Sequence, residues 1–238
     1  MMHIASVNMR KRNAVTHALL NTNENAHIIL IQEPWFNKIG TARNDNAKQG
    51  ADVLGGVASP AWEPLYPGTL EGKAPKAMAY ARKDLQHTSN PPHFTVVPRL
   101  DICVHPTVQV LDIVFDNETW QVINFYHDVL DITSRQALLA LDISATTPTL
   151  VMGDFNTHSR SWSPPDTPRS SWATQMEEWA AANLLTLAST PGEITRRGSG
   201  NDRDAVLDLV WLNDATAQAA TFSSDLQGSG DPYGFTPG

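Results

Sequence analysis

The sequence predicts an α/β protein, because short aliphatic runs typical of buried strands alternate with segments whose apolar residues recur at helical spacing. Residues 28–31 read Ile-Ile-Leu-Ile, and residues 149–152 read Thr-Leu-Val-Met. Such continuous runs are typical of strands that are covered on both faces. A third observation is that polar side chains directly follow several strands, which places them at the rim of a sheet. Helical spacing is found at residues 14–20, 132–141 and 172–182.

The run at residues 149–152 continues as Gly-Asp-Phe-Asn-Thr-His. In an extended chain the side chains of Asp154 and Asn156 lie on the same side. A carboxylate beside a carboxamide suits a hard cation and a phosphate oxygen. For this stretch alone, a strand followed by an ordinary Asp/Asn turn is an equally good interpretation.

Two further acids follow or interrupt apolar runs. Glu33 comes one residue after the run 28–31, and Pro34 is expected to hold it extended at the strand end. A plain surface acid is the alternative for Glu33. Asp208 is expected in the middle of a strand at residues 205–212. A charged side chain inside an apolar strand is costly unless it is paired or bound to metal.

The rest of the chain gives weaker signals. Residues 37–75 indicate an irregular connection with at most short strands, and Ser171 is expected to cap the helix at 172–182. Residues 198–201 predict a glycine hairpin. Further strands are expected at residues 3–7, 77–81, 95–98, 102–105, 107–115, 120–126 and 184–187.

Composition limits the class of protein. The chain has 238 residues, one cysteine and a formal net charge of −8. A single cysteine excludes an internal disulfide framework and fits a reducing compartment. No apolar run reaches the roughly 20 residues that span a bilayer, and the N-terminus does not resemble a signal peptide. We therefore expect one domain, residues 1–238, in an intracellular protein of the cytoplasm or nucleus that does not bind membranes.

The negative charge by itself does not indicate nucleic-acid binding, which usually needs a basic patch. Two basic clusters stand out against it: Arg10, Lys11 and Arg12, and later Arg196, Arg197 and Arg203. Such clusters usually form a solvated surface. The alternative is local contact with phosphate on an otherwise acidic protein.

Five motifs in order resemble the endonuclease/exonuclease/phosphatase superfamily, and within it the endonuclease domains of LINE-type retrotransposons and the apurinic/apyrimidinic endonucleases. The resemblance covers nearly the whole chain. The motifs are Asn8 after the first strand, Ile31-Gln32-Glu33-Pro34, Asn124-Phe125-Tyr126, Gly153-Asp154-Phe155-Asn156-Thr157-His158 with Trp162, and Leu207-Asp208-Leu209-Val210-Trp211.

The resemblance implies a four-layer α/β sandwich, in which two mixed sheets pack face to face and helices flank them. It implies that Glu33 and Asn8 bind Mg²⁺ or Mn²⁺ and that Tyr126 meets the scissile phosphate. Asp154 would orient or deprotonate the attacking water, Asn156 would bind phosphate, and Asp208 would orient a terminal histidine. The segment 195–205, with Arg196, Arg197 and Arg203, corresponds to a loop that contacts DNA, as His158 is also expected to do.

The C-terminus departs from the family, which ends in Ser-Asp-His and a final core strand. This chain has Ser229-Gly230-Asp231-Pro232, so proline stands where histidine is expected. We interpret Asp231 as the aspartate of that motif and as a metal ligand. His127 or His158 could replace the histidine. The remaining residues predict no closing strand, and therefore a C-terminally truncated domain with an exposed sheet edge.

The function expected from these observations is divalent-metal-dependent hydrolysis of phosphodiester bonds, with DNA as substrate and nicking as the reaction. A reverse transcriptase domain is an expected partner in the parent element. One alternative is an impaired or inactive relic that still binds metal and phosphate. The other is a phosphatase or phosphodiesterase of the same superfamily that acts on a substrate other than nucleic acid.

Overall fold

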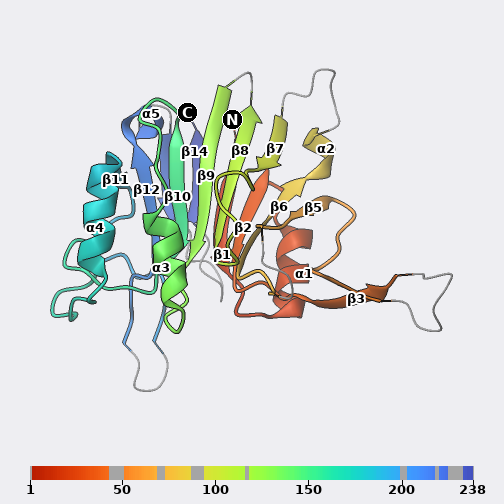
Figure 1. The fold of residues 1–238 in the computed structure, drawn as a ribbon, viewed down its shortest axis with the longest axis horizontal. Coiled ribbons are helices and arrows are strands. Elements are labelled where there is room, and N and C mark those ends of the chain that lie inside the picture. Colours follow the sequence, from red (N-terminus) through yellow and green to blue (C-terminus); the bar gives the residue numbers. More distant parts are fainter. Residues whose placement is uncertain are drawn as a thin grey trace.

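Two six-stranded sheets pack face to face, with helices on their outer sides (Figure 1). The computed structural model describes residues 2–42, 51–68, 73–86, 94–115, 118–198, 203–217, 220–224 and 233–237. The first sheet contains, in spatial order, β13 (Ala220–Ser224), β14 (Tyr233–Pro237), β1 (Ile4–Asn8), β2 (Ile28–Gln32), β6 (Ala77–Arg82) and β5 (Trp62–Leu65). The second contains β11 (Leu185–Leu187), β12 (Asp208–Asn213), β10 (Thr149–Asp154), β9 (Glu118–Tyr126), β8 (Val108–Phe115) and β7 (Phe94–Pro98).

The helices cover both outer faces. Figure 1 shows α3 (Ile132–Leu139) and α4 (Ala173–Ala182) beside the second sheet, and α1 (Asn13–Thr22) on the other side of the molecule. Two short helices, α2 (Lys83–Gln86) and α5 (Asp214–Ala217), complete the described set. A hairpin of β3 (Asn37–Thr41) and β4 (Asp52–Gly55) projects from the sandwich. The predicted α/β sandwich is confirmed.

Each continuous aliphatic run contributes side chains to two of the three apolar clusters, one on each face of its sheet. In β2, Ile28 and Leu30 face the cluster between the two sheets, whereas Ile29 and Ile31 face the cluster beneath α1. All four side chains are fully buried. Because side chains alternate across a strand, an unbroken aliphatic run is stable only where both faces are covered. This is the physical reason why the sequence folds into layers.

A pair of buried amides joins the two sheets. Gln32 Nε2 donates to Asn124 Oδ1 at 2.7 Å, across the interface between β2 and β9. Asn124 Nδ2 in turn donates to the carbonyl oxygen of Met78 at 2.8 Å. Both amide side chains are fully buried. Buried polar groups stabilise a unique arrangement when they are hydrogen-bonded, so this pair fixes how the sheets sit against each other.

The expectation of a missing closing strand is wrong. β14 pairs antiparallel with β1, where Ala5 lies opposite Gly234, and it pairs on its other side with β13. Backbone hydrogen bonds to two neighbours allow a segment rich in glycine and proline to form a strand despite its low propensity. The edge of β1 that was expected to be exposed is therefore covered.

Three smaller expectations are also wrong. Residues 102–105 form no strand, since only an isolated bridge joins His105 to Val108. Ser171 does not cap α4, whose N-cap is Trp172 without a side-chain hydrogen bond. Asp208 does not lie in the middle of a strand but begins β12. The Phe155 amide still donates to the Leu207 carbonyl, but the amide of Leu207 donates to Thr195 Oγ1 instead of to the neighbouring strand, so the pairing ends there.

The arms of the predicted hairpin at residues 195–205 are present. Arg196 and Ala205 exchange two backbone hydrogen bonds of 2.9 Å. The glycine tip at residues 199–201 lies outside the described residues. In the described part of the chain, no helix has both the length and the apolar character needed to cross a membrane.

Gly153 is the position where any side chain is excluded. Its φ is +140°, and an added Cβ would lie 1.9 Å from the carbonyl oxygen of Phe125 on the neighbouring strand. We expect Gly153→Ala to lower the free energy of unfolding by about 3 kcal/mol or more, since it combines strain with overpacking. Gly192→Ala is the matched control. Gly192 also has a positive φ, +79°, but has no atom within 4 Å of its added Cβ.

Chemical denaturation of both variants measures this difference. The control should lose only about 1–2 kcal/mol, the cost of the left-handed backbone alone. Equal losses in the two variants would contradict the assignment of Gly153 to close strand approach.

Candidate active site

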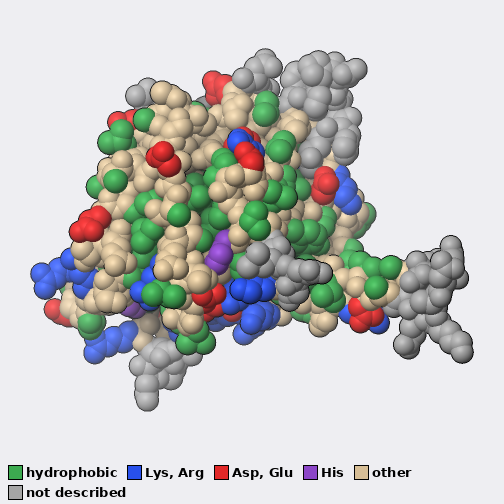
Figure 2. All heavy atoms as spheres, in the orientation of Figure 1, with side chains coloured by type: hydrophobic (Ala, Val, Ile, Leu, Met, Phe, Trp, Pro, Cys, Tyr) green, Lys and Arg blue, Asp and Glu red, His purple; other side chains and the backbone are tan. Residues whose placement is uncertain are grey.

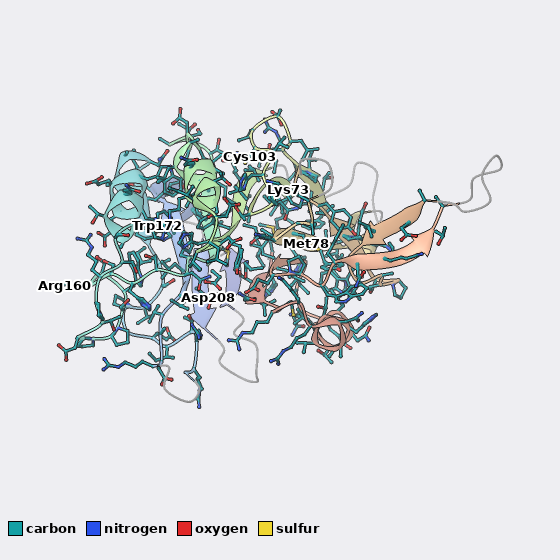
Figure 3. All side chains as sticks on the ribbon, turned by 60° about the horizontal axis from the view of Figure 1, so that its bottom comes forward. Lys73, Met78, Cys103, Arg160, Trp172 and Asp208 are labelled. Atoms are coloured by element: carbon teal, nitrogen blue, oxygen red, sulfur yellow. The ribbon has the colours of Figure 1, made fainter. Side chains whose placement is uncertain are left out.

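Polar side chains from both sheets meet at one edge of the sandwich. β1 ends at Asn8 and β10 ends at Asp154, whereas the antiparallel β12 begins at Asp208. Glu33 directly follows β2. Figure 3 turns the lower edge of Figure 1 forward and places Asp208 near the middle of it. Strand direction alone therefore gathers groups that are far apart in the sequence.

Asn8 connects the two sheets at this edge. Its Nδ2 donates to Glu33 Oε1 at 3.0 Å and to Asp154 Oδ2 at 2.8 Å. Its Oδ1 accepts from the backbone amide of Arg10 at 2.9 Å. One neutral amide thus holds two carboxylates beside each other, and both of its ends are fixed.

Glu33 is not extended, so the expectation drawn from Pro34 is wrong. Its φ is 45°, in the left-handed region. The conformation is maintained because its amide donates to the carbonyl of Lys76 at 2.9 Å and its carbonyl accepts from the amide of Lys11 at 2.8 Å. Non-glycine residues in this region are strained, and such strain is concentrated at functional sites.

Asp154 is the buried acid of the site, with 6% of its surface exposed. Burial raises its pKa to about 6, and the nearby charge of Glu33 acts in the same direction. Hydrogen bonds from Asn8 and from the amide of Asn156, and the charge of Arg196, oppose the rise. The carboxyl group therefore titrates close to neutral pH, as a proton acceptor in water chemistry requires.

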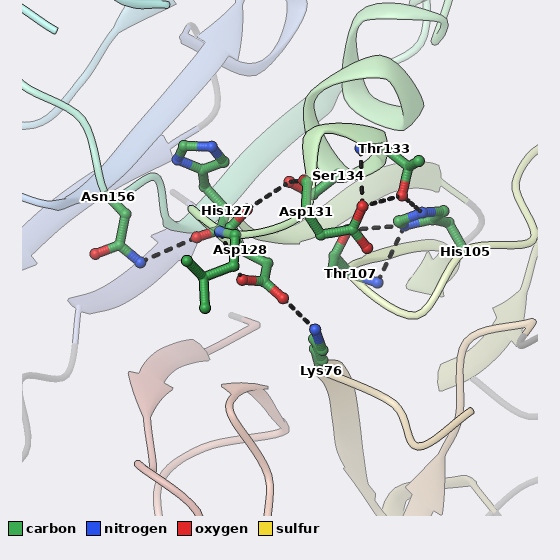
Figure 4. A network of polar contacts seen from close by, with 10 residues as sticks. Lys76, His105, Thr107, His127, Asp128, Asp131, Thr133, Ser134 and Asn156 are labelled. Atoms are coloured by element: carbon green, nitrogen blue, oxygen red, sulfur yellow. Dashed lines mark hydrogen bonds and ion pairs between the residues drawn. The ribbon is translucent and has the colours of Figure 1, made fainter. Parts of the chain in front are cut away.

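Asn156 is held in place by the loop that follows β10. Its amide donates to Asp154 Oδ1 at 3.0 Å, and its Nδ2 donates to the carbonyl of His127 at 3.1 Å (Figure 4). Its φ of 41° is again left-handed. Asn156 and Asp154 are thus fixed together, and the ordinary Asp/Asn turn is also part of a site.

His127 supports this loop from behind. Its Nδ1 lies 3.0 Å from the carbonyl of Phe155 and its Nε2 accepts from Arg135 Nε at 2.9 Å. A carbonyl can only accept, so Nδ1 carries the proton and the ring is neutral. Burial, followed by the charge of Arg135, lowers its pKa. Because the ring is 1% exposed, it is not positioned to replace a terminal histidine.

Tyr126 ends β9 and lies opposite Asp154 in the strand register. Burial raises the pKa of its hydroxyl, and the negative charges of Glu33 and Asp154 raise it further. The hydroxyl is therefore neutral at physiological pH and can donate a hydrogen bond.

Asp208 lies opposite Asp154 in the pairing of β10 with β12 and is 7% exposed. Its amide donates to Thr195 Oγ1 at 3.1 Å. Thr195 is itself the residue before Arg196, so this bond ties the hairpin arm to the strand that carries the acid. Asp208 and Arg196 consequently lie around the same pocket.

The pocket has a volume of about 420 Å³. It combines three acids with three arginines, so it can hold both a cation and an anion. Arginine and lysine side chains are visible along the same edge in Figure 2. The lining residues are Asn8, Met9, Arg10, Arg12, Val15, Glu33, Asp154, Asn156, Arg196, Leu207 and Asp208.

The structure brings most of the predicted site residues together. Arg196 also lines a second pocket of about 300 Å³, which contains His158 and Arg203. Arg197 is exposed and is not in the lining of either pocket. Asp231, predicted as a metal ligand, lies outside the described residues.

Arg10 and Arg12 line the main pocket, although they were not among the predicted site residues. The signal that could have identified them is the basic cluster directly after Asn8. The chain turns at residues 10–11, directly after Asn8, and Arg10 and Arg12 therefore line the same pocket as Asn8.

The donor atoms fit a hard divalent cation. Among the described residues, no group of three or more His, Cys, Asp or Glu side chains could hold a metal ion. Mg²⁺ does not require such a group, since it binds one or two carboxylates and retains several waters. Glu33 lies close enough to Asp154 to raise its pKa. Two carboxylates joined only by the neutral amide of Asn8 form an environment that a bound cation would stabilise.

Comparison with known proteins was made on sequence and on structure. The model of the endonuclease–reverse transcriptase family matches residues 120–231. No curated protein matches the chain. The endonuclease domain of TRAS1, a telomere-specific non-LTR retrotransposon, superposes with a TM-score of 0.68 at 13% identity, covering 100% of this chain and 98% of that one.

Two further structures have a similar fold. The AP endonuclease of Leishmania major gives a TM-score of 0.64 at 12% identity, covering 98% of this chain and 86% of its own. The catalytic domain of Xenopus laevis APE2 gives a TM-score of 0.58 at 13% identity, covering 99% of this chain and 91% of that one. The predicted resemblance is therefore confirmed: this chain has the fold of the endonuclease/exonuclease/phosphatase superfamily and resembles its retrotransposon-type and apurinic/apyrimidinic endonucleases.

Proposed function

We propose that this protein is a divalent-metal-dependent endonuclease that nicks DNA, of the type that retrotransposons encode. The observation that carries the proposal is the shared amide of Asn8, which holds Glu33 and Asp154 at 3.0 and 2.8 Å in one pocket. Two carboxylates in different environments can have different roles, one as a ligand of a cation and the other as a proton acceptor.

Glu33, with the amide oxygen of Asn8, would hold Mg²⁺ or Mn²⁺, and Asp231 is proposed as a further ligand. When bound, the ion supplies positive charge against the oxygens of the reacting phosphate. The loop contacts of Glu33 support this role, because its backbone is hydrogen-bonded on both sides. Its carboxylate is held separately by the amide of Asn8 at 3.0 Å, so it loses little further conformational entropy on binding.

Asp154 acts as the general base. At neutral pH its carboxylate accepts a proton from water as the water oxygen attacks phosphorus and the bond to the sugar oxygen breaks. The sugar oxygen leaves with the bonding electrons and takes a proton from solvent water. A pKa of about 6 suits this transfer, since the group is ionised yet still basic. Its two oxygens already accept from Asn8 and from the amide of Asn156, so its orientation is fixed.

The phosphate is bound by groups around the base. Asn156 and the neutral hydroxyl of Tyr126 donate to its non-bridging oxygens. Arg196 supplies the positive charge that the family's terminal histidine would provide, since it lines the pocket and acts on the charge of Asp154. Asp208 positions this region through the hairpin arm. His158, Arg197 and Arg203 contact DNA farther along the backbone.

Nicking of supercoiled plasmid in Mg²⁺ tests the base. Asp154→Asn should reduce the rate by about 100-fold or more, because general base catalysis typically contributes factors of that size. Asp142→Asn is the matched control, since Asp142 is exposed and lies beyond the far end of α3. It should nick at the wild-type rate.

Three results would count against the proposal. Equal nicking by wild type and Asp154→Asn would remove Asp154 from the chemistry. No nicking by the wild type, with metal binding retained, would instead support an inactive relic. Hydrolysis of small phosphomonoesters without nicking would support a phosphatase.

Folding stability should depend on pH through Asp154. An unfolded aspartate titrates near 3.9, as typical values indicate, whereas the folded carboxyl group titrates at about 6. Between these values the folded state binds the extra proton. The free energy of unfolding therefore decreases as pH rises from about 4 to about 6, and this contribution is constant above.

The effect should be on the order of 2–3 kcal/mol and absent from Asp154→Asn. Urea denaturation of both proteins in EDTA measures it, at about pH 4.5, near the lower end of this window, and at about pH 7.5, above it. The stability of the wild type relative to the variant should fall at the higher pH. If this difference between the two proteins is the same at both pH values, the raised pKa of Asp154 is wrong.

A further inference from the structure

A second concave surface lies directly beside Glu33 and has no part in the chemistry above. It has a volume of about 600 Å³ and is lined by Trp35 and Phe36, by Pro34, Pro75 and Pro106, and by three lysines. We name it the Trp35 groove. The lysines are Lys11, Lys73 and Lys76.

The aromatic side chains of this groove are unusual for the molecule. The chain has seven tryptophans, and six of them are at most 7% exposed. Trp35 is the exception, since it is only half-buried. The ring of Phe36 is held edge-on by Tyr66, with ring centroids 5.7 Å apart. Trp35 packs against the apolar cluster beneath α1, so only part of its ring is accessible. A partly exposed aromatic ring in a concave site is typical of a binding surface.

The charge of the groove is opposite to that of the protein. The chain has a net charge of −8, but the groove has three lysines and one acid, Asp131. Lys76 forms an ion pair with Asp128, as Figure 4 shows. In the described part of the chain, no ion pair is formed by Lys11 or Lys73. A ligand that meets both features carries negative charge and flat apolar rings.

The groove and the pocket are lined by residues that are neighbours in the chain, although they share no lining residue. Pro34 links Glu33 to Trp35, and two residues of extended chain span at most about 7 Å. The amide of Lys11 donates to the Glu33 carbonyl at 2.8 Å, so the backbone of this lysine lies next to a residue that lines the pocket. A strand with one phosphate at Asp154 would bring its next nucleotides to the groove.

We propose that the Trp35 groove binds an unpaired segment of the DNA strand adjoining the scissile phosphate. One or more bases stack on Trp35, and the backbone phosphates contact Lys11 and Lys73. The bases must be unpaired, because paired bases are stacked within the duplex and do not expose their faces. This inference rests on the proposed nuclease function, and it adds a preference for DNA that is open beside the cut.

Intrinsic fluorescence provides a direct test, because Trp35 is the accessible tryptophan. A short oligothymidylate is titrated into the full chain in EDTA, where no cleavage interferes, and its affinity is measured by anisotropy of a labelled copy. We expect quenching of tryptophan emission on binding. Trp35→Ala should weaken binding by about 10-fold or more and remove the quenching, since stacking on one aromatic has effects of this size. Trp35→Phe should retain most of the affinity.

Lysine variants test the charge. Lys73→Ala should weaken binding and reduce its dependence on salt. Lys83→Ala is the control, because Lys83 follows β6 at the end of the sheet away from the pocket, where its Nζ donates to the Ser59 carbonyl. This variant should bind as the wild type does.

The outcomes separate this inference from the nuclease proposal. Binding that is unchanged by Trp35→Ala, or binding of blunt duplex as tight as that of the single strand, overturns the groove whether or not the protein nicks plasmid. The proposal is also overturned if an apolar peptide displaces the labelled oligothymidylate but unlabelled oligothymidylate does not. Loss of binding in Trp35→Ala with no nicking by the wild type retains the groove and rejects the nuclease.

Discussion

The rest of the site depends on the side-chain amide of Asn8, because it donates hydrogen bonds to two carboxylates that come from different sheets. Glu33 is 25 residues away in the chain and Asp154 is 146 residues away. The distances of 3.0 and 2.8 Å can be kept only if the sheets do not slide. The buried pair of Gln32 and Asn124 provides that constraint, since it joins the sheets by a 2.7 Å hydrogen bond in the layer behind the site.

Stability is reduced at the same edge of the sandwich. Asp154 is buried at the cost of a raised pKa, and Glu33 and Asn156 both have left-handed backbones. Beside them, Gly153 occupies a conformation that no side chain tolerates. Such strained positions persist only when surrounding contacts determine them. Here those contacts are the backbone hydrogen bonds of Lys11 and Lys76 and the neutral ring of His127 behind the loop.

The layered arrangement and most strand ends could be predicted from the sequence, because they depend on residues that are neighbours in the chain. An aliphatic run such as residues 28–31 can be stable only between two covered faces, and a polar residue after it must lie at the rim. The sequence was not sufficient for features that depend on distant partners. The backbone of Glu33 depends on Lys11 and Lys76, the start of β12 on Thr195, and the strand β14 on hydrogen bonds to β1 and β13. The Trp35 groove combines segments separated by more than sixty positions, as Lys11 and Lys76 illustrate.

The two carboxylates joined by Asn8 are proposed to form one metal-dependent hydrolytic site. The most direct test of this proposal is calorimetric titration of Mn²⁺ into the wild type and into Glu33→Gln, with plasmid nicking followed in the same samples. Glu33→Gln should weaken Mn²⁺ binding at the site by about 10-fold or more and slow nicking, because a charged ligand is lost. Equal Mn²⁺ affinity in the two proteins, or nicking that persists in EDTA, would contradict it.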